Sequence, residues 1–212
     1  MGRVDRCQKR QQMTYQIYLG SASPRRIELL QQMDIPFIQR VLDVDETYPA
    51  ALTETAIVDF LAKLKGKAHQ SSLNKNELVL TADTIVWHRG TALGKPANRD
   101  EAFSMLSSLA GKTHQVLSAV CLSSAQKQWC VHDCTYVTMK ELSSDEINYY
   151  LDNYHPLDKA GAYGIQEWMG AVGVTKIEGS YTNVMGLPTE KTYTLLQPFE
   201  LGNANKMMHH TP

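Results

Sequence analysis

The chain has 212 residues, a formal net charge of −1, 43% hydrophobic residues and 20% charged residues. This length permits one domain, or one domain with two lobes around a cleft, and the composition is ordinary for a globular protein with a sizeable core. The near-neutral charge excludes the global positive field of most nucleic-acid binders. No apolar run approaches the length that crosses a membrane. An anionic ligand would therefore need a local cluster of positive charge.

Both ends of the chain are polar. Residues 1–12 are basic and contain no apolar segment of the kind that secretory signals carry, so we expect a disordered extension, with Met13 as a sensible alternative first residue. Residues 201–212 are expected to form a flexible tail. Residues 13–200 then form a single domain.

The four cysteines form no CxxC pair and no zinc-finger spacing. Cys130, His132 and Cys134 share the segment CVHDC. A metal site is one interpretation, but the segment is typical of a strand in which free thiols pack as small hydrophobic groups. We therefore expect free cysteines in a reducing compartment, which indicates the cytoplasm.

The first half of the chain alternates short strands with helices. Strands are expected at 15–19, 36–41 and 78–87, and helices at 24–33 and from Thr53 onward, with Thr53 as the cap. One face of the long helix carries apolar residues at helical spacing: Ile57, Phe60, Leu61, Leu64 and Ala68.

The second half predicts a β-hairpin between helices. Further elements are expected as follows: a helix over 100–109, hairpin strands over 115–123 and 128–139, a helix from a Ser143–Glu146 capping box to Asn153, a strand over 171–177, and a last helix opened by Pro188. Interleaved helices followed by a hairpin predict an α/β fold with a mixed parallel and antiparallel twisted sheet and flanking helices.

The segment LGSASPRR, residues 19–26, has the parts of an anion site at the start of a helix. Ser23 can cap the helix, so that its free N–H groups and positive dipole end face the preceding loop. Ser21 adds a hydroxyl, and Arg25 and Arg26 point about 100° apart, so that one can grip a phosphate while the other contacts a neighbouring part of a ligand. On local sequence alone, a capped helix with two solvated arginines is the commoner interpretation.

Asp83 lies inside the apolar run LVLTADTIV. A carboxylate in such a run costs free energy unless it is paired, hydrogen-bonded or bound to a metal. The position therefore favours a general base or a metal ligand over a structural aspartate.

Other charged residues have two interpretations each. Glu46, in the acidic segment DVDE, could bind a hard cation or be solvated, and Lys95 is held by the turn Gly-Lys-Pro. Lys67 lies near the end of the long helix, where a cation also complements the dipole. Lys63 and Lys65 on the same helix are expected to face solvent.

The segment PLDKAGAYGIQ, residues 156–166, is expected to be an irregular loop of the kind that builds sites. Gln166 offers a donor and an acceptor, which suits the edge of a nucleobase. The seven histidines show no metal-binding spacing, so we assign none of them to catalysis.

Taken together, these segments resemble the Maf family of nucleotide pyrophosphatases. The resemblance runs from about Tyr15 to Phe199 and rests on eight segments in the same order: LGSASPRR, DVDET, GKA, TADTIV, LGKP, SLAGKTHQV, PLDKAGAYGIQ and GSYTNVMGLP. It implies two lobes around a deep cleft, a divalent cation (Mg or Mn), and attack of water on the α-phosphorus of a nucleoside triphosphate.

The resemblance also implies roles for individual residues. Asp83 resembles the general base and a metal ligand, and Glu46 a ligand of metal or water. The phosphate cradle is implied to consist of Ser21, Arg25, Lys67 and Lys95. A homodimer is implied as well, with a small-molecule nucleotide as the partner and neither nucleic acid nor membrane.

Three residues resemble the subclass that acts on dTTP and UTP, namely Arg26, Thr84 and Gln166. Two alternatives are kept: a 7-methyl-GTP pyrophosphatase of the same family, and a nucleotide-binding regulator of cell division. The residues after Gln166, Glu-Trp-Met, depart from the small residues common in the family and leave fine selectivity open.

Overall fold

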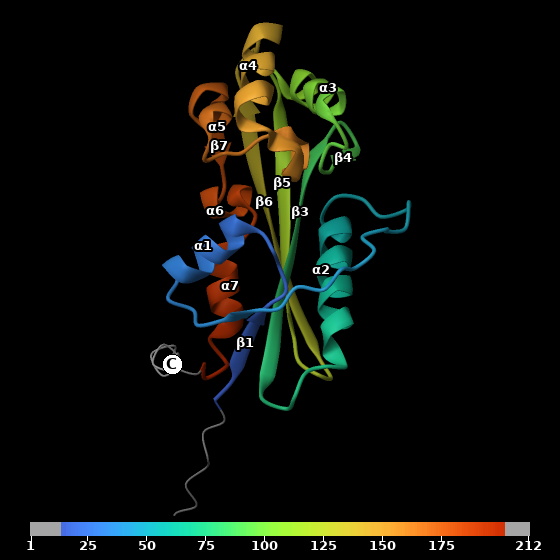
Figure 1. Cartoon of the computed structure of the whole chain (residues 1–212), viewed down its shortest axis with the longest axis vertical. Helices are drawn as coiled ribbons and strands as arrows, with labels where there is room; N and C mark the ends of the chain where they lie inside the picture. The colour runs from blue at the N-terminus through green and yellow to red at the C-terminus, as the bar shows by residue number, and fades with distance from the viewer. Residues whose placement is uncertain (1–13, 202–212) are drawn as a thin grey trace, which may run out of the picture.

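The computed structural model describes residues 14–201, and one seven-stranded mixed sheet runs through it (Figure 1). The strand order is β2-β1-β3-β5-β6-β7, with β4 beside β3. The strands are β1 Gln16–Leu19, β2 Ile38–Gln39, β3 Glu77–His88, β4 Thr91–Leu93, β5 Thr113–Ser123, β6 Gln128–Met139 and β7 Val174–Glu178. β1 is parallel to β2 and β3, and the other pairs are antiparallel, which confirms the predicted mixed sheet.

Helices cover both faces of this sheet. They are α1 Pro24–Gln32, α2 Thr55–Gln70, α3 Arg99–Leu109, α4 Ser144–Tyr154, α5 Trp168–Gly173, α6 Tyr181–Met185, α7 Thr189–Leu196, and two 3₁₀ helices, η1 Pro156–Asp158 and η2 Ala160–Ala162. Figure 1 shows α2 on one side of the sheet and α1 and α7 on the other, with α3, α4 and α5 gathered at one end. Within residues 14–201, no helix is long and apolar enough to cross a membrane.

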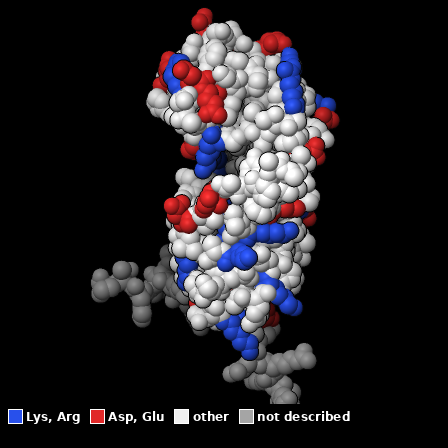
Figure 2. All heavy atoms as spheres, turned by 90° about the vertical axis from the view of Figure 1, so that its right-hand side faces the viewer, with Lys and Arg blue, Asp and Glu red and all other residues white. Residues whose placement is uncertain are grey.

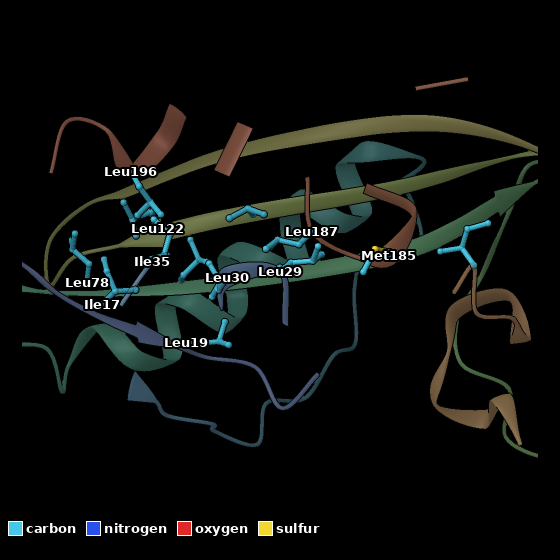
Figure 3. Close-up of a cluster of buried hydrophobic side chains, with 14 residues drawn as sticks. Ile17, Leu19, Leu29, Leu30, Ile35, Leu78, Leu122, Met185, Leu187 and Leu196 are labelled. Atoms are coloured by element: carbon cyan, nitrogen blue, oxygen red, sulfur yellow. The ribbon is translucent and has the colours of Figure 1, made fainter. Parts of the chain in front are cut away.

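Alternation along β3 divides its side chains between the two faces of the sheet. Leu78 and Leu80 pack with α1 and α7 in the core drawn in Figure 3. Ile85 packs instead in the cluster beneath α2. Because successive strand residues point to opposite faces, Asp83 shares the α2 face with Ile85. The same face therefore carries both an apolar cluster and a buried carboxylate.

Several sequence predictions are confirmed. The 113–123 and 128–139 strands form the expected hairpin, closed by a hydrogen bond from Ser124 N to Lys127 O. Ser143 and Glu146 form the predicted capping box of α4. The packed part of the chain reaches Leu201, which forms an isolated bridge with Tyr15, whereas the predicted N-terminal extension and residues 202–212 of the tail lie outside the described residues.

Other boundaries were wrong. The predicted strand over 171–177 is the helix α5 followed by the shorter β7, because Trp168 and Met169 pack with the core under α3 and α4. The predicted strand over 36–41 shrinks to β2. Helix α2 begins one residue later than expected, with Glu54 instead of Thr53 at its N-cap. Pro188 is the N-cap of α7 and not its first residue.

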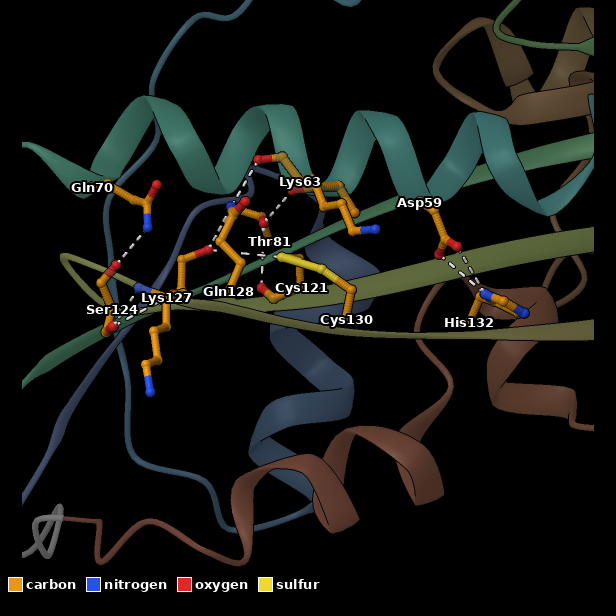
Figure 4. The surroundings of a disulfide bond; sticks show 12 residues. Asp59, Lys63, Gln70, Thr81, Cys121, Ser124, Lys127, Gln128, Cys130 and His132 are labelled. Atoms are coloured by element: carbon orange, nitrogen blue, oxygen red, sulfur yellow. Dashed lines mark hydrogen bonds and ion pairs between the residues drawn. A yellow bond between two sulfur atoms is a disulfide. The ribbon is translucent and has the colours of Figure 1, made fainter. Parts of the chain in front are cut away.

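The prediction of free cysteines was also wrong. Cys121 and Cys130 are direct partners across the β5–β6 hairpin, with Cα atoms 4.2 Å apart, and they form a disulfide beneath α2 (Figure 4). A search for closely spaced pairs misses them because the hairpin register, and not local spacing, brings residues nine positions apart together. Cys134 is the one free cysteine within residues 14–201.

A buried histidine ties the sheet to the later loop. His114 of β5 is 2% exposed, and its Nε2 lies 2.7 Å from the hydroxyl oxygen of Tyr163. Burial lowers the pKa of His114 to about 4. Its ordinary value is about 6.5, so the unfolded chain takes up the proton first as the pH falls.

We expect His114 to make the fold sensitive to acid. Its contribution to stability is complete above pH 6.5 and is lost as the pH falls from 6.5 to about 4, by on the order of 3 kcal/mol. Urea unfolding of the wild type and of His114→Gln at pH 7.5 and pH 4.5 measures this loss. The variant should lose less free energy of unfolding between the two pH values, and equal losses would contradict the assignment.

Candidate functional site

The site lies where strand pairing on one edge of β3 is interrupted. β1 pairs with β3 only as far as Leu80, and β4 joins the same strand at Val86. Residues 81–85 therefore have a neighbouring strand on the β5 side alone. The chain leaves β1 at Gly20, whose N–H donates to Leu80 O at 2.9 Å, and the resulting gap opens into a cavity.

The cavity has a volume of about 780 Å³, within the usual range for a small-molecule site. Its first wall comprises the start of α1, one stripe of α2 and the loop over 41–48. Its second wall comprises Gly94–Lys95 and residues 158–165. Figure 2 shows the molecule hollowed between its two ends, where acidic and basic side chains lie close together.

Three charged side chains meet where the first wall joins β3 at the floor of the cavity. Lys65 Nζ lies 2.6 Å from Asp83 Oδ1 and 3.0 Å from Glu46 Oε1. Asp83 is 7% exposed, whereas the Glu46 side chain is 50% exposed at the rim. One ammonium group therefore connects a buried carboxylate to a half-exposed carboxylate at the rim, and all three groups line the cavity.

The environment of Asp83 perturbs its ionisation. Burial raises the pKa of this carboxyl group above its ordinary value, while the charges of Lys65 and Arg26 act in the opposite direction. A buried carboxylate with a raised pKa and two cationic neighbours is the arrangement expected of a proton acceptor in a cleft.

The structure places Lys65, and not Lys67, in the cavity, which corrects the sequence prediction for both residues. The Lys65 side chain is 15% exposed, whereas Lys67 is exposed outside the cavity lining. The buried face of α2 is centred on Val58 and Ala62, whereas Leu64 is only partly buried at its edge and Ala68 is exposed. This rotation of the helix puts Lys65 inward, and a residue two positions further points to the opposite side.

The predicted anion loop lies in the same wall. Ser21 is 8% exposed, and its Oγ accepts hydrogen bonds from Ser23 N at 3.3 Å and from Arg26 Nη1 at 3.2 Å. With both acceptor positions in use, the Ser21 hydroxyl proton remains to be donated to a ligand. Ser23 occupies the N-cap of α1, but its side chain makes no capping hydrogen bond. The first N–H groups of the helix therefore have no side-chain partner from the cap and remain free to bind an anion in the cavity.

Arg26 is held by the protein on several sides. Its Nε donates to Gly186 O at 2.9 Å, its Nη1 also donates to Ala82 O at 2.9 Å, and its Nη2 donates to Thr84 Oγ1 at 3.2 Å. The bond to Ala82 satisfies a carbonyl of the interrupted edge of β3. Arg26 thus fixes the geometry of the gap and keeps Thr84 in the cavity lining.

Two lysines face the cavity from the second wall. Lys95 is exposed, and its turn is attached to η2 through a hydrogen bond from Gly161 N to Gly94 O at 3.0 Å. Lys159 is 7% exposed, with its Nζ 2.7 Å from Asp158 Oδ1 and 2.9 Å from Glu167 Oε1. Lys159 was not among the predicted site residues, and its only signal in the sequence is its place in the loop segment DKAGAYG.

Gln166 does not lie where it was predicted. Its side chain is exposed, does not line the cavity, and donates from Nε2 to Glu28 Oε2 at 3.4 Å. Its neighbour Ile165 is 8% exposed and lines the cavity instead. Of the predicted site residues, the structure brings together Ser21, Arg25, Arg26, Glu46, Asp83, Thr84 and Lys95, and leaves Lys67 and Gln166 outside.

The donor set fits a divalent cation bound together with a phosphate ligand. No group of three or more His, Cys, Asp and Glu side chains within residues 14–201 is arranged to hold a metal by itself. Asp83 and Glu46 nevertheless converge on one ammonium position. Mg²⁺ is commonly held by one or two carboxylates, with substrate phosphates and water completing the shell.

The chain is similar to several bacterial proteins that share one name. A dTTP/UTP pyrophosphatase of Flavobacterium johnsoniae is 51% identical over 86% of this chain and 94% of its own length. A dTTP/UTP pyrophosphatase of Bacteroides fragilis is also 51% identical, over 86% of this chain and 95% of its own. One of Porphyromonas gingivalis is 46% identical, over 89% and 96%.

A solved structure of the Staphylococcus aureus Ham1 protein aligns with a TM-score of 0.44 and 13% identity, over 59% of this chain and 72% of that chain. The profile described as "Maf-like protein", by contrast, matches residues 16–199, which include every element that lines the cavity. The chain therefore belongs to the family of Maf-like proteins.

Proposed function

We propose that this chain hydrolyses dTTP and UTP to the nucleoside monophosphate and pyrophosphate, with a divalent cation, Mg or Mn, held by Asp83 and Glu46. The proposal is supported by the names of relatives about 50% identical over most of the chain, which are dTTP/UTP pyrophosphatases. The observation that carries it is the buried carboxylate of Asp83, paired with Lys65 at the floor of a cavity lined by further cations.

The residues around the cavity suit hydrolysis of a polyphosphate. The Asp83 carboxylate accepts the proton of the attacking water, an effect worth about 10²–10⁴-fold in rate. Lys65 and Arg25 offset the charge that develops on the departing pyrophosphate, and the Ser21 hydroxyl donates to a phosphate oxygen. A bound cation would neutralise further charge on the phosphates and orient them.

Selection of the pyrimidine base is part of the proposal. Arg26 and Thr84 lie together on one side of the gap in the sheet and are connected by a hydrogen bond. Their fixed donors and acceptors suit a polar base edge. Gln166 could reach such a base only by leaving Glu28, so its contribution to selection requires a different side-chain orientation from the one observed.

A substrate panel tests the proposed function. The purified chain is incubated with Mg²⁺ or Mn²⁺ and with dTTP, UTP, CTP or 7-methyl-GTP, and release of pyrophosphate is measured. We expect the highest kcat/KM with dTTP and UTP. Preference for 7-methyl-GTP would assign the chain to the alternative specificity, and no pyrophosphate from any pyrimidine triphosphate would overturn the proposal.

Two further parts of the proposal concern context. We place the reaction in the cytoplasm, where nucleoside triphosphates are made and used, and fractionation of cells checks this placement. We also propose a homodimer, which sedimentation of the purified chain measures directly.

A further inference from the structure

One carboxylate connects cations on opposite walls of the cavity. Asp158 Oδ2 lies 3.4 Å from Arg25 Nη1, and Asp158 Oδ1 lies 2.7 Å from Lys159 Nζ. Arg25 belongs to α1 in the first wall, whereas Asp158 and Lys159 belong to the second wall. All three residues line the cavity. The two oxygens of Asp158 therefore each contact one of two cations that face the same space.

Neither cation is a typical solvated surface charge. Lys159 is 7% exposed and has Glu167 as a second carboxylate partner, and the Arg25 side chain is 27% exposed. The Asp158 side chain is 57% exposed, so it is the component of the group that can leave most easily. Although burial alone would raise it, the pKa of Asp158 is lowered by the hydrogen bond and charge of Lys159 and by Arg25. Asp158 is therefore anionic at neutral pH.

A carboxylate that bridges an arginine and a lysine has the contacts that a phosphate group would make. Arginine and lysine are the side chains that bind phosphate oxygens through charge-assisted hydrogen bonds. An exposed pair with a 3.4 Å separation contributes little stability by itself. A phosphate group with a larger negative charge can therefore replace it.

We propose that Asp158 occupies a phosphate subsite as an internal counter-ion, and that a polyphosphate displaces it and binds Arg25 and Lys159 together. This inference rests on the proposed function, because it takes the ligand to be the polyphosphate of a nucleotide. It adds Lys159 as a phosphate-binding residue and gives Asp158 a role that opposes binding. The bound phosphate would join the two walls, since its two cationic partners come from different walls.

The inference predicts that one substitution in the cavity strengthens ligand binding. Removing an acidic side chain from the cavity should tighten binding, because the ligand no longer competes with Asp158 for the two cations. For Asp158→Asn we expect the Kd of inorganic tripolyphosphate to fall about three- to tenfold, the range of a partly exposed ion pair. Isothermal titration calorimetry on the full chain measures this without any turnover. Asp158→Ser is a second variant if Asp158→Asn does not fold.

Two matched variants separate displacement from a change in overall charge. Asp152→Asn removes a carboxylate of similar exposure, 60%, whose partner Arg99 lies outside the cavity. Asp43→Asn removes a carboxylate that lines the cavity and forms no ion pair with Arg25 or Lys159. Neither should tighten tripolyphosphate binding more than twofold. If Asp43→Asn tightens it as much as Asp158→Asn does, the effect is one of net charge and the inference is overturned.

A double-mutant cycle tests the contact itself. In an Arg25→Gln background, Asp158→Asn should tighten binding less than it does in the wild type, because one of the two cations is already gone. Lys159→Gln should weaken tripolyphosphate binding about tenfold, whereas Lys140→Gln, which removes a paired lysine outside the cavity, should not. Equal effects of Asp158→Asn in both backgrounds would overturn the inference.

Failure of this inference can be distinguished from failure of the proposed function. If the wild type releases pyrophosphate from dTTP while Asp158→Asn binds tripolyphosphate no more tightly, only the inference is wrong. If the wild type neither binds tripolyphosphate nor hydrolyses any nucleotide, both are wrong. Unfolding midpoints in urea confirm that each variant is folded before its binding is compared.

Discussion

Asp83→Asn should lower kcat for dTTP by about 10²–10⁴-fold, because an amide cannot accept the proton of the attacking water. The substitution keeps the size of the side chain and a hydrogen-bond acceptor for Lys65, which lies 2.6 Å away. Substrate binding through Arg25 and Lys95 should be affected much less than turnover. Steady-state kinetics with dTTP, together with calorimetric binding of tripolyphosphate, separates the two effects.

Asp133→Asn is the matched control for this experiment. Asp133 is a strand carboxylate paired with a lysine, Lys191, at 2.7 Å, and its side chain is 21% exposed, but it does not line the cavity. Its replacement should leave kcat within about twofold of the wild type, as expected for a surface ion pair. A kcat for Asp83→Asn within tenfold of the wild type would remove Asp83 from the role of general base.

Lys65→Gln should reduce kcat/KM by about 10²–10³-fold, while Lys67→Gln should change it less than twofold. The first value is typical for loss of one positioned group that stabilises charge in the transition state. Lys65 contacts both Asp83 and Glu46, and its loss would also leave the buried Asp83 carboxylate without its nearest counter-charge. Lys67 is exposed on the other side of the same helix.

Lys65 and Lys67 are matched controls for each other, because both are lysines of α2 and both are replaced by glutamine. Both variants are assayed with dTTP and UTP, and urea unfolding corrects for any difference in stability. If Lys67→Gln is the damaging substitution and Lys65→Gln is not, α2 has the opposite rotation in the active enzyme and the assigned first wall is wrong.

Elements that depend on local preferences were predictable from the amino-acid sequence alone, and so were residues whose chemistry conflicts with their surroundings. The hairpin around Ser124 and the capping box of Ser143 need only short-range spacing, and both are confirmed. Asp83 was recognisable because a carboxylate within an apolar strand must be compensated by a partner. The mixed sheet followed from strands that alternate with helices before the hairpin.

The packing of the whole fold was needed to show which of two similar residues faces the cavity and which distant residues meet. The apolar spacing predicted a face of α2 centred near Leu64 and Ala68, but packing on β3 and β5 buries Val58 and Ala62 and turns Lys65 inward. The Cys121–Cys130 pair needed the hairpin register. The contact of Arg25 with Asp158 joins residues 133 positions apart. Such contacts depend on how separate elements pack, and local sequence carries no information about that arrangement.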